Sequence, residues 1–358
     1  MEAGLSAQRR PGSGAWIGAG VLLLFLVAGL FYVKWDPYFH KAFVAAAKHS
    51  IGGSIVTGAS AGAPAVGWRA AWDYTRTYGK DIWTAILLGL ILGSGIQAAL
   101  PRQWLLRVLG STRYKPTLLA GAAAVPSMMC TCCAAPMAVG LAQSGASVGS
   151  VLAYWLGNPV LNPATLIFIG FVLGWRWVVL RIALGLVLVF GVAHLAQGLL
   201  RPEDVPTAAR QAHQDAAASP ADNRPLALRW IHGFWRLAIG LIPEYFVVVV
   251  LLGAARAWLF PAMSPAVGHS LWLVLLLGVT GTLFVIPTAG EVPIIQTLTR
   301  FGLGAAGAGT LLITLPAVSL PSLLMVGRGV PVRVLTFVAL SVLVLGLVSG
   351  AAAWALHL

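Results

Sequence analysis

Long apolar stretches dominate the chain, and polar or proline-containing stretches separate them. Residues 16–33 and 82–100 are almost uninterrupted apolar runs. Runs of similar character occupy residues 175–200, 234–260 and 330–356. A bilayer requires about 20 apolar residues per helix, so each run predicts one membrane crossing. The pattern therefore predicts an all-α integral membrane protein.

Between these runs, the apolar pattern is interrupted. Residues 116–174 hold apolar pieces of about ten residues, which are too short to cross a bilayer unless they join as broken helices. Interruptions recur after the apolar run at 268–287, around IPTAGEVP, RFGLG and LPAVSLP. Residues 34–80 mix charges with a Gly- and Ala-rich stretch, so we expect an interfacial or amphipathic helix there. The polar residues 201–229 indicate a solvated linker.

The interruptions recur at matching positions in two halves of the chain. A proline, a glycine nine residues later and a proline twenty-three residues after the first occur twice. The next pair, Asn162-Pro163 against Leu320-Pro321, requires one inserted residue. Internal duplication explains the pattern, and broken helices at equivalent places in two repeats point to a transport site. Parallel and inverted arrangements both remain open. The matching triplets are Pro136, Gly145 and Pro159, and Pro293, Gly302 and Pro316.

These patterns predict about 8–10 transmembrane helices in two structural repeats, with broken half helices at the centre and an extra N-terminal helix. We expect four regions. Residues 1–80 hold the N-terminal transmembrane helix and its amphipathic extension, and residues 81–200 hold the first repeat with the cysteines. Residues 201–230 form the polar linker, and residues 231–358 form the second repeat.

Composition and charge support a membrane protein. Hydrophobic residues make up 59% of the 358 residues and charged residues 9%, whereas soluble domains carry about 25% charged residues. The formal net charge of +13 would suggest nucleic acid in a soluble protein. Here Arg102, Arg107, Arg113 and Lys115 directly follow an apolar run, as expected of a cytoplasmic loop. We therefore expect the lipid bilayer, and no nucleic acid, as a partner.

All three cysteines lie within four consecutive residues. Cys130, Cys132 and Cys133 are flanked by Pro126 and Pro136, which prevent one continuous helix. Unwound backbone at membrane depth is tolerated only where protein buries it or where it lines a cavity. Clustered thiols are soft ligands for Cu(I) and Zn(II), and by the same argument for trivalent arsenic and Hg(II). The three cysteines are therefore predicted to bind a substrate or metal ion.

One thioether lies next to the thiols, and the thiols have two alternative roles. Met129 adds a thioether next to the cluster. Cysteine is also a small apolar residue that is often buried, so the cluster can serve packing alone. A redox role is the third alternative, although adjacent Cys132 and Cys133 pair only through a strained vicinal disulfide.

A few polar residues inside apolar sequence are further candidates. Glu291 lies in the second-half break, where it can carry a coupling proton or act as an interfacial acid at a helix N-terminus. Glu244 follows Pro243 and is expected to cap a helix at the interface. The amides of Asn158 and Asn162 either line a pathway or satisfy backbone groups freed by prolines. Ser319 marks the partner break and is a further binding candidate.

The sequence CTCCAAP, followed by Gly145 and NPVLNPATL, resembles the C-[ST]-C-x-A-x-P and NP-x-x-NPATL patterns of a family of bacterial predicted permeases. That family includes the ArsP-type efflux permeases for trivalent organoarsenicals. The resemblance covers residues 80–355. It implies a secondary carrier of the bacterial inner membrane, with about eight spans in paired repeats and the motif cysteines at Cys130 and Cys132. Cys133 stands where the family often has Ser, and a third thiol suits a different soft ion.

The combined expectation is a secondary-active permease that exports a thiophilic metalloid or metal compound, such as a trivalent organoarsenical. Glu291 would couple transport to protons, and a role in arsenic resistance follows from the resemblance. No cofactor and no enzymatic activity are expected, and a homo-oligomer is a further candidate assembly. One alternative is a permease or channel subunit for a small non-metal solute with structural cysteines. The other is a membrane thiol oxidoreductase.

Overall fold

The computed structural model describes residues 13–56, 64–100, 102–200, 225–260, 268 and 270–358. Helices account for the architecture of this part of the chain, and it contains no strand. Seven of the described helices are long and apolar enough to cross a membrane, and two shorter apolar helices accompany them. The all-α membrane fold is confirmed. The expected 8–10 helices correspond to seven long helices plus two hairpins of half helices.

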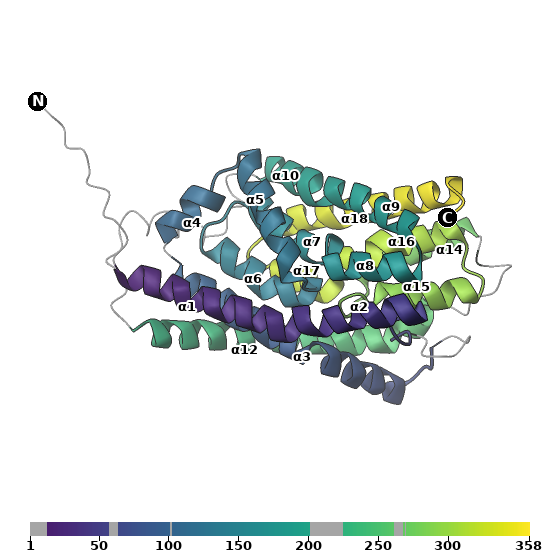
Figure 1. Ribbon diagram of the computed structural model, residues 1–358, viewed down its shortest axis with the longest axis horizontal. Coiled ribbons are helices and arrows are strands. Elements are labelled where there is room, and N and C mark those ends of the chain that lie inside the picture. Colours follow the sequence, from purple (N-terminus) through teal and green to yellow (C-terminus); the bar gives the residue numbers. More distant parts are fainter. Residues whose placement is uncertain (1–12, 57–63, 101, 201–224, 261–267, 269) are drawn as a thin grey trace, which may run out of the picture.

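The N-terminal rod is longer than its apolar pattern. It consists of α1 (Ser13–Leu30), the π-helical η1 (Phe31–Trp35) and α2 (Asp36–Lys48), which follow one another without a gap (Figure 1). The next helix, α3 (Trp68–Ala99), begins well before the apolar run at 82–100 and crosses the expected boundary at residue 80. Much of 34–80 is therefore the polar extension of two spans rather than a separate interfacial helix.

The first half of the chain continues with a hairpin, a broken helix and a long helix. The polar linker expected at 201–230 lies largely outside the described residues. The elements of the first half are α4 (Arg102–Leu109), α5 (Tyr114–Ala124), η2 (Val125–Ser127), α6 (Thr131–Gln143), α7 (Val148–Val160), α8 (Pro163–Val172), α9 (Trp175–Leu186), η3 (Val187–Val192), α10 (Ala193–Leu195) and η4 (Ala196–Leu199).

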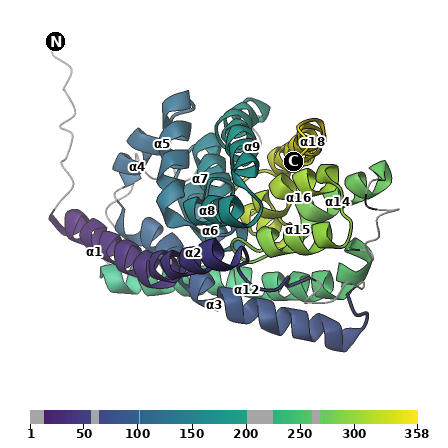
Figure 2. The ribbon, with the colours of Figure 1, turned by 45° about the vertical axis from the view of Figure 1, so that its right-hand side comes forward.

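The second half repeats this order. It has one long helix, a hairpin, a broken helix and a final long helix. These elements are α12 (Leu226–Leu259), α14 (Leu271–Leu283), α15 (Glu291–Arg300), α16 (Ala305–Ala317), α17 (Leu320–Val326) and α18 (Val332–Ala355). Figure 2 shows the later elements of the two halves side by side, with α3 and α12 running together beneath them.

The helix ends gather at two opposite ends of the molecule (Figure 1). Hydrogen bonds show which helix ends lie together. At one end, the backbone N–H of Ser147 donates to Leu109 O (2.8 Å), and Gln197 Nε2 donates to Thr112 O (3.2 Å). At the other end, Arg176 Nη2 donates to Leu356 O (2.8 Å). The hairpin α5–α6 enters and leaves at the first end, whereas α14–α15 enters and leaves at the second (Figure 1). The two repeats therefore have inverted topology.

The turn after each hairpin shows the duplication at atomic detail. Gly145 and Gly302 both have a positive φ, of 94° and 101°. After Gly145, Ala146 N donates to Leu141 O, and after Gly302, Leu303 N donates to Leu298 O, each over 3.0 Å. The left-handed glycine is the usual way to end a helix with its last carbonyls satisfied. The same offset aligns α7 with α16 and Asn162 with Ser319, so no inserted residue is needed.

Small residues bring α3 against the cysteine-bearing helix α6. A Cβ atom added at Gly89 would collide with the backbone oxygen of Cys133, and one at Gly93 would meet Pro136 O. Gly140 of α6 approaches the backbone of Gly93 in the same way. Such small-residue contacts allow membrane helices to pack backbone to backbone. This packing fixes α6, and with it the cysteine cluster, against α3.

Candidate functional site

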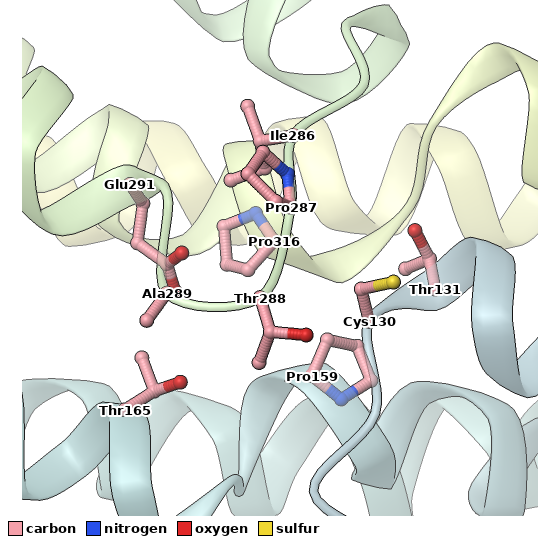
Figure 3. A pocket seen from close by; sticks show the side chains of 10 residues that line it. All are labelled: Cys130, Thr131, Pro159, Thr165, Ile286, Pro287, Thr288, Ala289, Glu291 and Pro316. Carbon is pink, nitrogen blue, oxygen red and sulfur yellow. The ribbon is translucent and has the colours of Figure 1, made fainter. Parts of the chain in front are cut away.

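Four chain breaks meet at the centre of the molecule. They are the two hairpin tips, at 128–130 and 284–290, and the two helix breaks, at 161–162 and 318–319. A small cavity of about 10 Å³ lies between them and is lined from both repeats; Figure 3 shows the side chains that line it. Its lining residues include Cys130, Pro159, Thr288 and Pro316. Two of the prolines that marked the breaks in the sequence, Pro159 and Pro316, therefore line one cavity.

Cys130 and Cys133 form a close pair of thiols. Their Sγ atoms lie 2.8 Å apart, and both side chains are buried and free of disulfides. Cys130 is the N-cap residue of α6, and Cys133 lies three residues later on the same face of the helix. The C-x-x-C spacing therefore creates a dithiol. From the sequence, all three cysteines were expected to act together, and only the adjacent Cys132 and Cys133 were considered as a disulfide pair, although the C-x-x-C spacing was visible.

Cys132 points to a different environment. Successive helical residues are rotated by about 100°, so Cys132 cannot share the face of Cys133. Its Sγ lies 3.5 Å from Ser319 Oγ and 3.8 Å from Thr131 Oγ1. Within the described residues, no group of three His, Cys, Asp or Glu side chains is arranged to hold a metal ion. The ligand set of all three cysteines stays a prediction; in this conformation Cys130 and Cys133 lie together, and Cys132 faces Ser319.

Met129 and Asn158 hold the first hairpin tip in place. The backbone N–H of Met129 donates to Asn158 Oδ1 (3.3 Å), while Asn158 Nδ2 donates to Tyr154 O (2.8 Å). Both side chains are fully buried. Neither lines the central cavity. Of the two roles left open for Asn158, the structure shows the satisfaction of backbone groups.

Asn162 and Ser319 are the N-caps of the two outer half helices, α8 and α17. Asn162 Oδ1 accepts from the backbone N–H groups of Ala164 (3.1 Å) and Thr165 (3.3 Å). Ser319 forms a capping box with Ser322. Asn162 Nδ2 is buried and has no hydrogen-bond partner among the described residues. This amide is therefore available to donate to a solute or to water.

A buried arginine, Arg181 of α9, joins the two repeats. Its Nη2 lies 3.1 Å from Glu291 Oε1, and both side chains are at most 2% exposed. Arg181 also donates to Pro159 O (2.9 Å), Val160 O (2.9 Å) and Leu312 O (2.5 Å). Glu291 is therefore a buried ion-pair partner at the start of α15, not an interfacial acid.

Prolines create the acceptors that Arg181 satisfies. In a continuous helix, Pro159 O would accept from residue 163 and Leu312 O from residue 316, but both residues are prolines and have no N–H. An unsatisfied carbonyl in a membrane interior costs several kcal/mol, by an order-of-magnitude estimate. Arg181 supplies the missing donors in both repeats. Arg181 was not among the candidates from the sequence, because residues 175–200 were interpreted only as a membrane span. An ionisable residue inside such a span is a signal that could have identified it.

A buried lysine from the N-terminal rod also reaches the site. Lys34 is 4% exposed, and its Nζ donates to Thr288 Oγ1 (3.1 Å) and Tyr38 OH (3.3 Å). The next residue, Trp35, donates through Nε1 to Pro126 O (2.8 Å). Consecutive residues of η1 therefore contact both hairpin tips. The sequence analysis missed Lys34 because it ended the first span at residue 33.

Glu244 differs from its expected role. It lies inside α12, and its Oε2 accepts a hydrogen bond from Arg328 Nη2 at 2.8 Å. The side chains of Glu244 and Arg328 are 36% and 45% exposed. The expectation of a helix cap was wrong because α12 continues through Pro243 without ending there.

Comparison with known proteins agrees with this architecture. A family described as predicted permease matches residues 68–353. The chain is 47% identical over 335 residues to UPF0718 protein YraQ of Escherichia coli (strain K12), covering 94% of each protein. It is 21% identical over 321 residues to UPF0718 protein MJ0584 of Methanocaldococcus jannaschii, covering 72% of this chain and 88% of that protein. No solved structure matches the chain. The family match, the close relative and the seven apolar helices show that the chain belongs to the ArsP-type family of predicted permeases and is a multi-pass membrane permease.

Proposed function

We propose that this permease is a secondary-active exporter of a thiophilic metalloid or metal compound, with Cys130 and Cys133 as the transient ligands. The observation that carries the proposal is the 2.8 Å separation of the two sulfurs at the central break. Two thiolates can chelate one trivalent arsenic or one soft metal ion. The transient site would release its solute by ligand exchange.

The inverted repeats suit this function. In secondary carriers, inverted repeats place the substrate site at their interface near the bilayer midplane. Alternating access then follows from movement of one part of the molecule around a fixed site. Here the hairpin tips arrive from opposite ends and carry Cys130 and Thr288 to the same small cavity. The basic loop after α3 favours a cytoplasmic position for the end of the molecule where α5 begins, and the bacterial inner membrane is the proposed location.

Efflux measurements with single substitutions test the role of the thiols. Cells or everted vesicles with Cys130→Ser or Cys133→Ser should lose most transport of phenylarsenous acid, because one thiol cannot chelate. Cys132→Ser is the matched control from the same helix, and it should retain transport because Cys132 faces Ser319. Unchanged transport in the Cys130→Ser/Cys133→Ser double variant would remove the dithiol from the mechanism. A loss of transport in Cys132→Ser, with transport retained in Cys133→Ser, would assign the site to Cys130 and Cys132.

Glu291 is the proposed proton carrier. Protonation of its carboxylate would break the ion pair with Arg181 and so couple a proton to the contact between repeats. Glu291→Gln keeps a hydrogen-bonding group of the same shape. This variant should retain binding of the solute but lose the stimulation of transport by a pH gradient. Full pH-gradient stimulation in a folded Glu291→Gln variant would assign coupling elsewhere.

The C-x-x-C geometry also favours a second candidate, a membrane thiol oxidoreductase. Cys130 at the N-terminus of α6 is placed as in helix-capping redox motifs. Oxidation of the two thiols to a disulfide releases two electrons and two protons, which a quinone or a partner disulfide would have to accept. Thiol-alkylation mass shifts during turnover separate the candidates. A reversible loss of two alkylated thiols supports redox chemistry, and thiols that stay reduced support transport.

A further inference from the structure

Resting on the proposed function, we propose that the transported solute carries an anionic group as well as a thiophilic atom, and that Lys34 binds this group. The side chain is 4% exposed, and its recorded partners, Thr288 and Tyr38, are neutral hydroxyls. Among the described residues, no carboxylate lies within ion-pair distance of its ammonium group. A buried charge is normally paired, so this ammonium has an open position for an anion.

The ammonium group also has a free donor. A lysine ammonium has three N–H donors, and the described contacts use two of them. Thr288, which accepts from Lys34, lines the central cavity together with Cys130 (Figure 3). A solute held by the sulfurs therefore has its next group within reach of the cation.

A second cavity connects Lys34 to the outside of the protein. This vestibule has a volume of about 220 Å³ and is lined by Lys34, Lys41, Asp81 and the segment 287–290. Lys41 and Asp81 are exposed at its mouth and interact electrostatically with each other, whereas Lys34 lies buried. Thr288 lines both this vestibule and the central cavity. An anionic group can therefore occupy the vestibule while the thiophilic atom reaches Cys130.

Three helix N-terminal ends lie at the site. The N-terminal ends of α6, α8 and α15 lie at the central breaks, where α7, α14 and α16 also end. An N-terminal end carries partial positive charge and a C-terminal end partial negative charge, and broken helices in carriers aim N-terminal ends at anionic substrate groups. The formal charges favour an anion, because Lys34 and Arg181 are two buried cations at the site and Glu291 is the one buried carboxylate among the described residues there. Asn162 Nδ2 is a further buried donor without a described partner.

The cation comes from outside the part of the chain that matches the permease family. The family match begins at residue 68, whereas Lys34 belongs to the rod formed by α1, η1 and α2. The π-helical turn inserts one extra residue per turn, and such turns occur frequently at functional sites. This turn directs Lys34 to one hairpin tip and Trp35 to the other. The N-terminal rod thereby adds a selectivity element to the thiol site.

Two matched arsenicals test the proposal. Phenylarsenous acid is neutral at pH 7, and its 4-carboxyphenyl analogue carries one negative charge. Equilibrium binding of both probes is measured with purified full-length protein in nanodiscs, for wild type, Lys34→Gln, Lys34→Arg and Lys48→Gln. We expect Lys34→Gln to weaken binding of the carboxylated probe by about tenfold or more, with the neutral probe changed by less than about twofold. Lys34→Arg should retain the wild-type preference, and so should the control Lys48→Gln, which removes an exposed lysine of the same rod outside the vestibule.

The remaining outcomes show whether the inference about Lys34 fails alone or together with the proposed thiophilic function. If Lys34→Gln weakens binding of both probes equally, Lys34 acts on the thiols. If Lys34→Gln binds both probes with the wild-type affinities, Lys34 binds no anion. Either result overturns the inference. The Cys130→Ser/Cys133→Ser variant tests the underlying function separately. If that variant binds both probes as wild type does, or if wild type binds neither, the proposed thiophilic function fails and the inference fails with it. Lys34→Arg guards against misfolding, because it preserves the charge in the same place.

Discussion

The guanidinium group of Arg181 lies 3.1 Å from the carboxylate of Glu291, and this buried contact joins the first repeat to the second. Arg181 comes from the long helix that ends the first repeat, and Glu291 begins the second half helix of the opposite hairpin. The same guanidinium hydrogen-bonds to carbonyls of α7 and α16. Four elements around the site therefore depend on one side chain.

Arg181→Met should be among the most destabilising single substitutions in the protein. It leaves Glu291 buried without a counter-charge and also removes the donors for three carbonyls. Breaking a buried ion pair from one side costs about 3–5 kcal/mol, whereas an exposed pair contributes about 0–1 kcal/mol. Thermal unfolding in detergent measures the difference. Arg328→Met, which breaks the exposed pair with Glu244, is the control.

The double variant Arg181→Met/Glu291→Met refines this prediction. Removing both charges relieves the unpaired carboxylate but leaves the carbonyls of Pro159 and Leu312 without donors. We therefore expect a partial recovery of the melting temperature relative to Arg181→Met. Full recovery to the wild-type value would show that the carbonyl contacts contribute nothing to stability.

Gly89→Ala should displace the cysteine-bearing helix. A Cβ atom at this position would collide with the backbone oxygen of Cys133, and backbone cannot move aside as a flexible side chain can. Overpacking of this kind costs about 1–3 kcal/mol, and the shift of α6 should also weaken thiol-dependent binding. Thermal unfolding and arsenical binding measure the two effects.

Gly79→Ala is the matched control for Gly89→Ala. Both glycines lie in α3, but a Cβ atom at Gly79 has no atom within 4 Å. Alanine also has a better helix propensity than glycine, so this variant should be neutral or slightly stabilising. A loss of stability at Gly79 as large as that at Gly89 would show that the effect belongs to α3 rather than to its contact with α6.

The inverted topology predicts opposite accessibility for the two hairpin ends. Ser111→Cys lies at the end of the molecule that holds the basic loop, and Thr299→Cys lies at the far end of α15. Both positions are exposed, whereas the native cysteines are buried. A membrane-impermeant maleimide should label Thr299→Cys in intact cells, and Ser111→Cys only after the membrane is opened. Labelling of both from one side would contradict the inverted arrangement.

Much of the fold followed from local pattern. The apolar runs predicted the spans, and the proline and glycine spacing predicted the two repeats and the breaks at their centre. The cysteine cluster was placed correctly at a break inside the protein. The ends of the first two spans differed from the expectation, because helices continue beyond the apolar window when their polar ends leave the bilayer. Charge runs therefore marked the membrane boundary and not the helix boundary.

The sequence by itself determined that this protein is an α-helical membrane protein with two related halves and a thiol cluster at a helix break. Those features can be inferred from the sequence because they depend on composition and on the spacing of residues close together in the chain. Only the tertiary structure decided which thiols pair, how the repeats are oriented, and that Arg181 and Lys34 reach the centre. Lys34 and Thr288 are separated by most of the chain, and their contact depends on how the N-terminal rod packs against a hairpin of the opposite repeat. No local pattern encodes a contact of that kind, because it exists only after the helices have assembled.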